Sequence, residues 1–316
     1  MELIVKAPAK INLFLEITGK RPTGYHNLQT IMQTVDLCDE LTFELAETGG
    51  ISLSVTGPYA QSLPSDDGNI IIRAAKMLKE KYNAKKGAKI TLQKNIPTGA
   101  GLGGGSSDAA STLVTLARLW DIKISRGELE NIAISLGADV PFFLIGGAVL
   151  CEGIGEKTNS LFPPVYRKEG ERFLISVISE NPLKEFVVGI HDERYFPLSV
   201  VLVNPNFSVP TASVYQKVKL PFTNPREIDR IKNLVENGSL NFTNAGEFCF
   251  NRLEDFVLCD YPDIEDIKRF LTKMGCTALM SGSGSTVFGI YDPENRDKIE
   301  TELKKHSWKY WFVKTI

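Results

Sequence analysis

The feature that most constrains this chain is a glycine-rich segment that runs directly into a helix-like stretch. Residues 95–111 read NIPTGAGLGGGSSDAAS, and five of the seven residues from Gly99 to Gly105 are glycine. Apolar side chains then recur at helical spacing as far as Trp120, which predicts a helix that begins at Ser107 or Asp108. A flexible linker does not normally lead straight into such a helix. We therefore expect a structured glycine loop at a helix N-terminus.

Such a loop is suited to binding an anion. Glycine lets neighbouring backbone N–H groups turn into one concavity, and the helix N-terminus adds unpaired amides and the positive end of its dipole. Phosphate is the anion that this arrangement favours most, and serine hydroxyls can meet its oxygens or the shell of a Mg²⁺ ion. The predicted phosphate-binding residues are Pro97, Thr98, Gly99, Ala100, Gly101, Leu102, Gly103, Gly104, Gly105, Ser106 and Ser107.

Neither common phosphate motif fits the segment. Gly99, Gly101 and Gly104 match GxGxxG, but a dinucleotide fold needs this motif in its opening βαβ unit and an acidic residue about 20 positions later. Here the loop lies a third of the way along the chain, and Asp121 is only approximately placed. A P-loop is excluded because no GK[ST] sequence follows.

The remaining periodicity indicates an α+β fold. Strand-like alternation covers residues 11–17, 41–45, 51–55 and 89–92, and helical patterns cover 69–81, 125–136, 228–237 and 264–274. Residues 277–291 predict a strand, a glycine loop and a second strand, and residues 137–157 predict a glycine-punctuated strand and turn. The elements do not alternate as regular βαβ units, which argues against a doubly wound sheet. Residues 11–17 resemble a half-buried strand that exposes Lys10, Asn12 and Glu16 together with Phe14.

Composition limits the classes of partner. A net charge of −2 and a pI near 6.0 argue against nucleic acid, which requires a concentrated basic face. Five scattered cysteines and three histidines offer no metal cluster, and the odd cysteine count suits a reducing compartment. The opening residues lack the apolar core of a signal peptide, and no apolar run reaches membrane-spanning length. We expect a cytoplasmic protein without a membrane partner.

Three motifs resemble those of the GHMP kinases, the family of galactokinase, homoserine kinase and mevalonate kinase. PTGAGLGGGSSDAAS is similar to the family's phosphate motif, and KAPAKINLFLEI and LMSGSGSTVFGIY are similar to its first and last motifs, in the same order. The resemblance implies a two-domain α+β fold with an active site in the interdomain cleft. Residues 1–160 would form a ribosomal-protein-S5-like domain, and residues 161–316 a ferredoxin-like α/β domain. ATP and Mg²⁺ are the implied cofactors.

The resemblance also assigns the catalytic groups. Taken alone, Asp139 in LGADVPFFL is a cap or turn aspartate, and Lys10 is a solvated edge lysine. In the family pattern Asp139 falls on the catalytic base, and Lys10 lies beside it, where its charge holds the carboxylate ionised. Asn69 falls on the nucleotide side. In SGSG the resemblance places phosphate-end support, although a tight connection between strands is the simpler alternative: Ser281, Gly282, Ser283 and Gly284.

PAKINLFLEITGKRPTGYHNLQTI and LGADVPFFL resemble the branch of the family that phosphorylates a cytidine-diphosphate-linked polyol. This implies that Tyr25 and Tyr215 sandwich the cytosine while His26 reads its edge. Asn12 and Thr211 would also bind this substrate. Without the resemblance, a Tyr–His pair is equally well explained as a structural corner.

Two alternatives stay open. The chain could be a GHMP kinase for homoserine, mevalonate or a sugar, which would not need the GYH segment or Tyr215. It could also be a ligand-binding sensor without transferase activity, although Lys10 and Asp139 are both present. The segment at about 163–198 is longer than the link that the family usually has at this point, and the sequence does not indicate a function for it. Monomer and homodimer are both compatible with the sequence.

Overall fold

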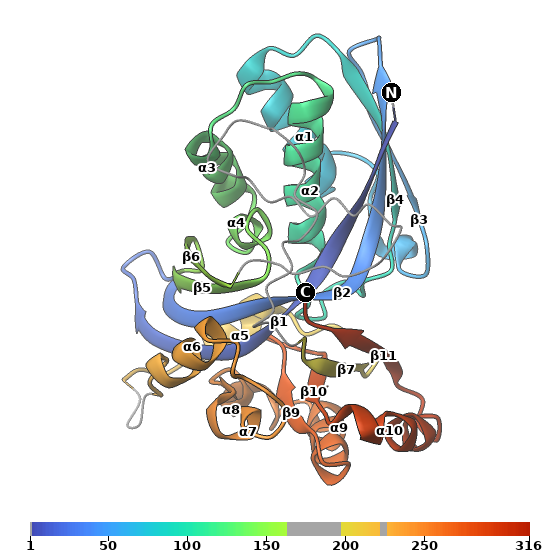
Figure 1. Cartoon of the computed structure of the whole chain (residues 1–316). Helices are drawn as coiled ribbons and strands as arrows, with labels where there is room; N and C mark the ends of the chain where they lie inside the picture. Colours follow the sequence, from blue (N-terminus) through green and yellow to red (C-terminus); the bar gives the residue numbers. More distant parts are fainter. Residues whose placement is uncertain (1, 163–196, 222–225) are drawn as a thin grey trace.

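The computed structural model describes residues 2–162, 197–221 and 226–316 (Figure 1). Apart from residues 197 and 198, the segment singled out as an insertion lies outside the described residues. Two β-sheets, each covered by helices, give the α+β architecture that the sequence predicts, without a doubly wound sheet. Among the described residues, no helix combines the length and apolarity that crossing a bilayer requires.

The larger sheet is built around two long strands. β1 and β2 are antiparallel, and the strand order β3-β4-β2-β1-β8 is extended by β5, which pairs with β2 and β6. The predicted strands at 41–45, 51–55 and 89–92 are confirmed as parts of β2, β3 and β4. The bounds are β1 Glu2–Lys20, β2 His26–Ala46, β3 Ile51–Thr56, β4 Gly87–Gln93, β5 Ala148–Gly153, β6 Lys157–Phe162 and β8 Phe250–Asn251.

The strand predicted at residues 11–17 is confirmed as part of β1, but it is not half-buried, because both faces of β1 are covered there. Every residue from Ala7 to Ile17 is buried. A register shift between Asn12 and Phe14 also interrupts the alternation. Leu13 and Phe14 consequently share one hydrophobic cluster, whereas Leu15 and Ile17 belong to another. The bulge lets a single strand serve two cores and re-aims its polar side chains.

Four helices cover one face of the larger sheet: α1 Ile70–Tyr82, α2 Gly104–Leu119, α3 Arg126–Leu136 and α4 Val140–Phe143 (Figure 1). Ser125 and Glu128 form a capping box at the start of α3, which confirms the helix predicted at residues 125–136. Residues 137–157, predicted as strand and turn, contain the short helix α4 before β5. The predicted start of α2, Ser107 or Asp108, is wrong by three or four residues, because the helix begins at Gly104 and its first hydrogen bond joins Ser107 N–H to Gly103 O.

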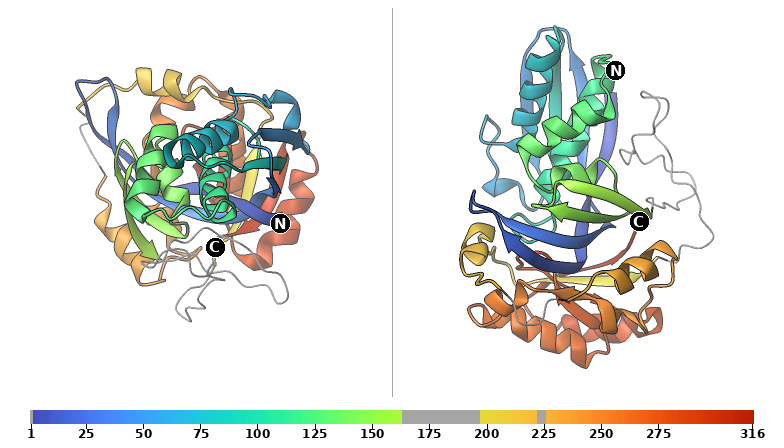
Figure 2. Two further views of the ribbon diagram at one scale, coloured as in Figure 1. Left: turned by 90° about the horizontal axis from the view of Figure 1, so that it is seen from above. Right: turned by 90° about the vertical axis from the view of Figure 1, so that its left-hand side faces the viewer.

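The smaller sheet has the order β11-β7-β10-β9 and is entirely antiparallel. Figure 2 shows it and its helices stacked beneath the larger sheet. The predicted strand–loop–strand at 277–291 is confirmed as β9 and β10, and the predicted helices at 228–237 and 264–274 as α6 and α9. The bounds are β7 Ser199–Asn204, α5 Thr211–Gln216, α6 Asp229–Glu236, α7 Ala245–Phe248, α8 Glu254–Val257, α9 Pro262–Lys273, β9 Thr277–Met280, β10 Val287–Ile290, α10 Arg296–Leu303 and β11 Lys309–Lys314.

β1 connects the two halves of the chain. The short strand β8 runs parallel to it, with Phe14 and Leu15 opposite Phe250 and Asn251. The guanidinium of Arg252 then grips the buried carboxylate of Glu16 through Nε and Nη2, at 2.8 and 2.7 Å. A buried, two-point ion pair therefore holds the second half of the chain against the central strand.

Candidate active site

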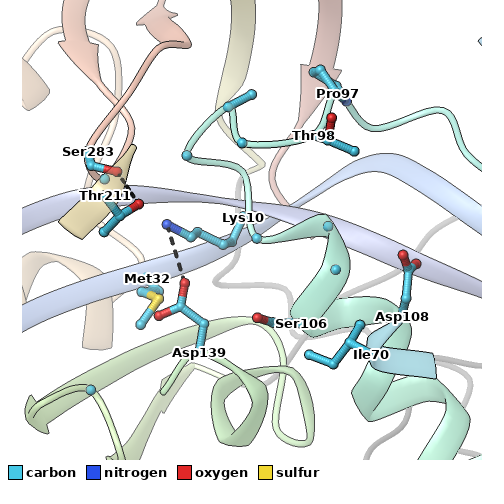
Figure 3. A pocket seen from close by; sticks show the side chains of 18 of the residues that line it. Lys10, Met32, Ile70, Pro97, Thr98, Ser106, Asp108, Asp139, Thr211 and Ser283 are labelled. Atoms are coloured by element: carbon cyan, nitrogen blue, oxygen red, sulfur yellow. Dashed lines mark hydrogen bonds and ion pairs between the residues drawn. The ribbon is translucent and has the colours of Figure 1, made fainter. Parts of the chain in front are cut away.

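A cavity of about 480 Å³ opens where the glycine loop, β1 and the loop between β9 and β10 meet (Figure 3). Lys10, Asp139 and Ser106 converge on this space from β1, from the start of α4 and from the first turn of α2. Residues 97–101 and 103–106 line it, and Gly282 and Ser283 close one side. The structure thus brings together four segments that are separate in the sequence: β1, the glycine loop with α2, the start of α4 and the β9–β10 loop.

The two glycine-containing loops are in direct contact. Ser281 Oγ donates to the carbonyl of Gly101 at 2.9 Å, and Thr286 N–H donates to the carbonyl of Ala100 at 3.2 Å. The first loop is also fixed to the central strand, because Lys10 N–H donates to Leu102 O at 3.0 Å. These three hydrogen bonds fix the conformation of the glycine loop in the absence of a ligand.

Glycine is required at Gly101 and Gly103. Both have a left-handed backbone, with φ of +78° and +70°, which side chains rarely adopt. A Cβ atom at position 101 would lie 2.0 Å from the carbonyl oxygen of Ser281, and one at position 103 would lie 2.8 Å from the ring of Phe143. The chain therefore needs bare backbone here for close approach.

Lys10 and Asp139 face one another across the cavity, with 4.0 Å between Lys10 Nζ and Asp139 Oδ2 (Figure 3). The Lys10 side chain is 5% exposed, which contradicts the solvated edge lysine expected from the strand alone, whereas Asp139 is 38% exposed. Burial lowers the pKa of Lys10, and the charge of Asp139 acts in the opposite direction. Asp139 occupies the N-cap position of α4 but makes no side-chain capping hydrogen bond, so its carboxylate is available to the cavity.

A chain of polar contacts orients Lys10. Its ammonium donates to Asn12 Oδ1 at 2.6 Å, Asn12 Nδ2 donates to Thr30 Oγ1 at 2.9 Å, and Thr30 donates to the carbonyl of Phe14 at 2.6 Å. Asn251 Nδ2 supports the other side by donating to the carbonyls of Met280 and Gly282, both at 2.7 Å. Thr30 and Asn251 were not predicted from the sequence, because their partners are distant in the chain or belong to the backbone.

A buried cluster of charged side chains lies beneath the glycine loop, and it too was not predicted from the sequence. Lys94 Nζ donates to Asp39 at 2.5 Å and to Asp108 at 2.6 Å, and all three side chains are at most 3% exposed. Asp39 also accepts from the backbone N–H groups of Asn95 and Ile96, at 2.6 and 2.8 Å. The cluster therefore fixes the entry of the loop. The sequence feature that could have indicated this cluster is a lysine just before the loop and an aspartate just after it.

A second cavity, of about 560 Å³, lies beyond Asp139 and contains the predicted base-binding residues. The rings of His26 and Tyr215 stack at 5.5 Å between centroids, with 25° between their planes. Tyr25 lines the same space and is 63% exposed. His26 is buried, and among the described residues its Nε2 atom has no hydrogen-bond partner. Burial, and then the charge of Lys20, lower the pKa of His26, so its ring is neutral near pH 7 and offers one donor and one acceptor.

The predicted site residues divide between these cavities. Asn69 lines the first cavity, but its side chain caps α1 by accepting from Ile71 N–H and also donates to Pro64 O, so it shapes the wall. Thr211 lines both cavities, and its hydroxyl lies 2.8 Å from that of Ser283. The predicted residues that line neither cavity are all buried: Leu102, Ser107, Ser281 and Gly284.

Comparisons with known proteins place this geometry in context. The profile described as the GHMP kinases N terminal domain matches residues 69–147, and the profile of the GHMP kinases C terminal region matches residues 225–307. A protein of Exiguobacterium sibiricum named 4-diphosphocytidyl-2-C-methyl-D-erythritol kinase is 38% identical over 297 residues, which is 94% of this chain and 91% of that protein. A kinase of the same name from Pelotomaculum thermopropionicum is 38% identical over 92% of this chain and 89% of its own length.

Solved structures agree with this result. A crystal structure of 4-(cytidine 5'-diphospho)-2C-methyl-D-erythritol kinase aligns with a TM-score of 0.73 and 30% identity, over 100% of this chain and 99% of that one. The homoserine kinase of Cytophaga hutchinsonii aligns with a TM-score of 0.68 at 18% identity, over 100% of this chain and 94% of that one, and shares the fold.

Proposed function

The chain belongs to the GHMP kinase family, and we propose that within it the chain phosphorylates the 2-hydroxyl of 4-diphosphocytidyl-2-C-methyl-D-erythritol with ATP. This reaction belongs to the non-mevalonate, methylerythritol phosphate route to isoprenoids. The named relatives at 38% identity support the substrate, since they match along nearly the whole chain.

One observation carries the proposal: Asp139, Thr211 and Tyr215 line both cavities. A triphosphate on the glycine loop would fill the first cavity, and a cytosine beside His26 and Tyr215 would fill the second. The acceptor hydroxyl of the same substrate would then lie at the junction, beside Asp139. Homoserine and mevalonate have no base that would use the aromatic cavity.

The residues at the junction supply the chemistry that phosphoryl transfer needs, which is positioning, charge neutralisation and removal of the acceptor proton. Asp139 accepts the proton of the attacking hydroxyl, and Lys10, 4.0 Å away, donates to the hydroxyl oxygen. Asn12 and Thr30 hold Lys10 in this orientation. Backbone N–H groups of residues 99–106 and the start of α2 bind the phosphates.

The donor set also suits Mg²⁺. Among the described residues, no group of three or more acidic, histidine or cysteine side chains could hold a metal by itself. Mg²⁺ in kinases is bound mainly by substrate phosphates and water, with one or two protein oxygens. The hydroxyl of Ser106, which lines the phosphate cavity, would be such a ligand. When bound, the ion would neutralise charge on the β- and γ-phosphate oxygens.

The proposal extends to the setting of the enzyme. We place the division between the two domains near residue 160, with the site in the cleft between 1–160 and 161–316. The chain would act in the cytoplasm on small molecules, without a nucleic-acid or membrane partner. Monomer and homodimer both accommodate this mechanism.

An ADP-release assay with Mg-ATP tests the function, using diphosphocytidyl-methylerythritol, homoserine, mevalonate and galactose as acceptors. We expect turnover with the cytidyl substrate alone. Turnover with another acceptor would retain the family and reject the base-binding cavity. ATP binding without turnover on any of the four would favour the sensor.

A further inference from the structure

The hairpin tip between β1 and β2 carries a cation toward the second cavity. Lys20 is the last residue of β1 and pairs with His26, the first residue of β2. Side chains of directly opposed residues in an antiparallel pair lie on the same face of the sheet. Both residues line the second cavity, and the charge of Lys20 contributes to the lowered pKa of His26. Lys20 is therefore a near neighbour of the base-binding residues.

The neighbouring cation is already engaged. Arg21 Nη2 pairs with Glu156 Oε1 at 3.1 Å, and its Nε donates to Asn27 Oδ1 at 2.7 Å. Two backbone hydrogen bonds close the turn, from Arg21 N–H to Tyr25 O at 2.7 Å and from Gly24 N–H to Arg21 O at 2.9 Å. Arg21 thus anchors the hairpin tip to the β5–β6 turn and fixes the position from which Lys20 extends.

Lys20 itself has no such partner: no carboxylate in the described ranges lies within ion-pair distance of it. Of the described residues that line the second cavity, Lys20 is the only cation and Asp139 the only anion. A ligand that reaches from the rings of His26 and Tyr215 to Asp139 passes through this field. Its negative charge is favoured near Lys20 and disfavoured near Asp139.

We propose that Lys20 binds the diphosphate of the nucleotide-linked substrate. This inference rests on the proposed function, because a diphosphate joins cytidine to the polyol that must reach Asp139. An exposed lysine contributes a mobile point charge, which suits a flexible diphosphate better than the rigid, planar guanidinium of an arginine would. Lys20 would then set affinity for the substrate without taking part in the transfer step.

The test compares CDP with cytidine, which has the base and ribose but no diphosphate. Each is titrated by calorimetry into wild type, Lys20→Gln and Lys20→Arg, with a non-hydrolysable ATP analogue present to fill the first cavity. Lys298→Gln is the matched control, because it removes the same charge from an exposed position on α10.

We expect Lys20→Gln to weaken CDP binding by about three- to tenfold and to leave cytidine binding unchanged. Lys20→Arg should retain most of the affinity, and about 0.5 M salt should abolish the difference between wild type and Lys20→Gln. In the kinase assay, Lys20→Gln should raise the KM for the cytidyl substrate and leave kcat and the KM for ATP unchanged. Lys298→Gln should match wild type throughout.

An equal loss of CDP and cytidine affinity, or no loss of either, would overturn the proposal. These results are distinct from failure of the proposed function. If wild type does not phosphorylate the cytidyl substrate, the function is wrong. If wild type does so and Lys20→Gln has the same KM, only the role of Lys20 is wrong.

Discussion

Gly101→Ala is expected to uncouple the two loops that form the phosphate cavity. The new Cβ would lie 2.0 Å from the carbonyl oxygen of Ser281 and 3.0 Å from that of Gly284. A carbon–oxygen contact needs about 3.3 Å, so the loops must separate by about 1.3 Å. The hydrogen bond from Ser281 Oγ to Gly101 O, now 2.9 Å, would break, and that from Thr286 to Ala100 would weaken.

The energetic cost has two parts. A non-glycine residue in the left-handed conformation costs about 1–2 kcal/mol, and each lost hydrogen bond about 1 kcal/mol. Displacement of a substrate-positioning loop by about 1 Å lowers activity about a hundredfold. We therefore expect kcat/KM for ATP to fall about a hundredfold in the coupled assay, with a lower melting temperature.

The matched control is Gly127→Ala, because a Cβ at this position in α3 meets no atom within 4 Å. This variant should retain wild-type activity and stability or gain slightly, since alanine favours a helix. Activity of Gly101→Ala within threefold of wild type, with normal stability, would show that the contact with Ser281 does not hold the loop.

Three further predictions concern charged groups. Asp139→Asn should lower kcat by about 10²–10⁴ with ATP affinity unchanged by calorimetry, and normal turnover would dismiss Asp139 as the base. Arg252→Leu leaves Glu16 buried without its guanidinium partner, so urea unfolding should show a loss of about 3 kcal/mol, partly restored by adding Glu16→Leu. Burial, and then the charge of Asp39, raise the pKa of Asp108 from 3.8 to about 8. The folded chain therefore holds a proton that the unfolded chain releases, and stability falls as pH rises from about 4 to 8. Asp108→Asn should flatten this fall in unfolding measurements at about pH 5.5 and 8.5, and an unchanged slope would argue against it.

The glycine loop could be predicted from sequence because its requirement is local. Left-handed φ values and close backbone approach exclude side chains at Gly101 and Gly103, so the requirement is written in the residue type. The start of α2 could not be predicted in the same way. Glycine has low helix propensity, so residue type alone places Gly104 outside a helix. The position requires glycine because α2 packs so closely there that a Cβ would meet Ile96 and Lys94, at 2.9 and 3.0 Å.

The burial of Lys10 also could not be predicted from the sequence pattern. Alternation in a strand indicates that one face is apolar, but it does not show whether another element covers the polar face. Here the glycine loop and the 281–286 loop cover it, the latter from a position 180 residues further along the chain than its partner Gly101. Thr30 and Asn251 were missed for the same reason, since each acts through backbone carbonyls that only the fold brings near.

The continuity of β1 has a consequence for how such a protein can change during evolution. Lys10 and Asn12 lie in the middle of this strand, whereas Lys20 and the hairpin tip lie at its end and Thr211 and Tyr215 belong to α5. Under the proposed mechanism, the transfer chemistry and the choice of acceptor are therefore encoded in separate segments. Replacement of the hairpin tip and α5 would exchange one acceptor for another while Lys10, Asp139 and the glycine loop kept their positions. The same catalytic centre can thus be inherited by enzymes that share no substrate except the phosphate donor.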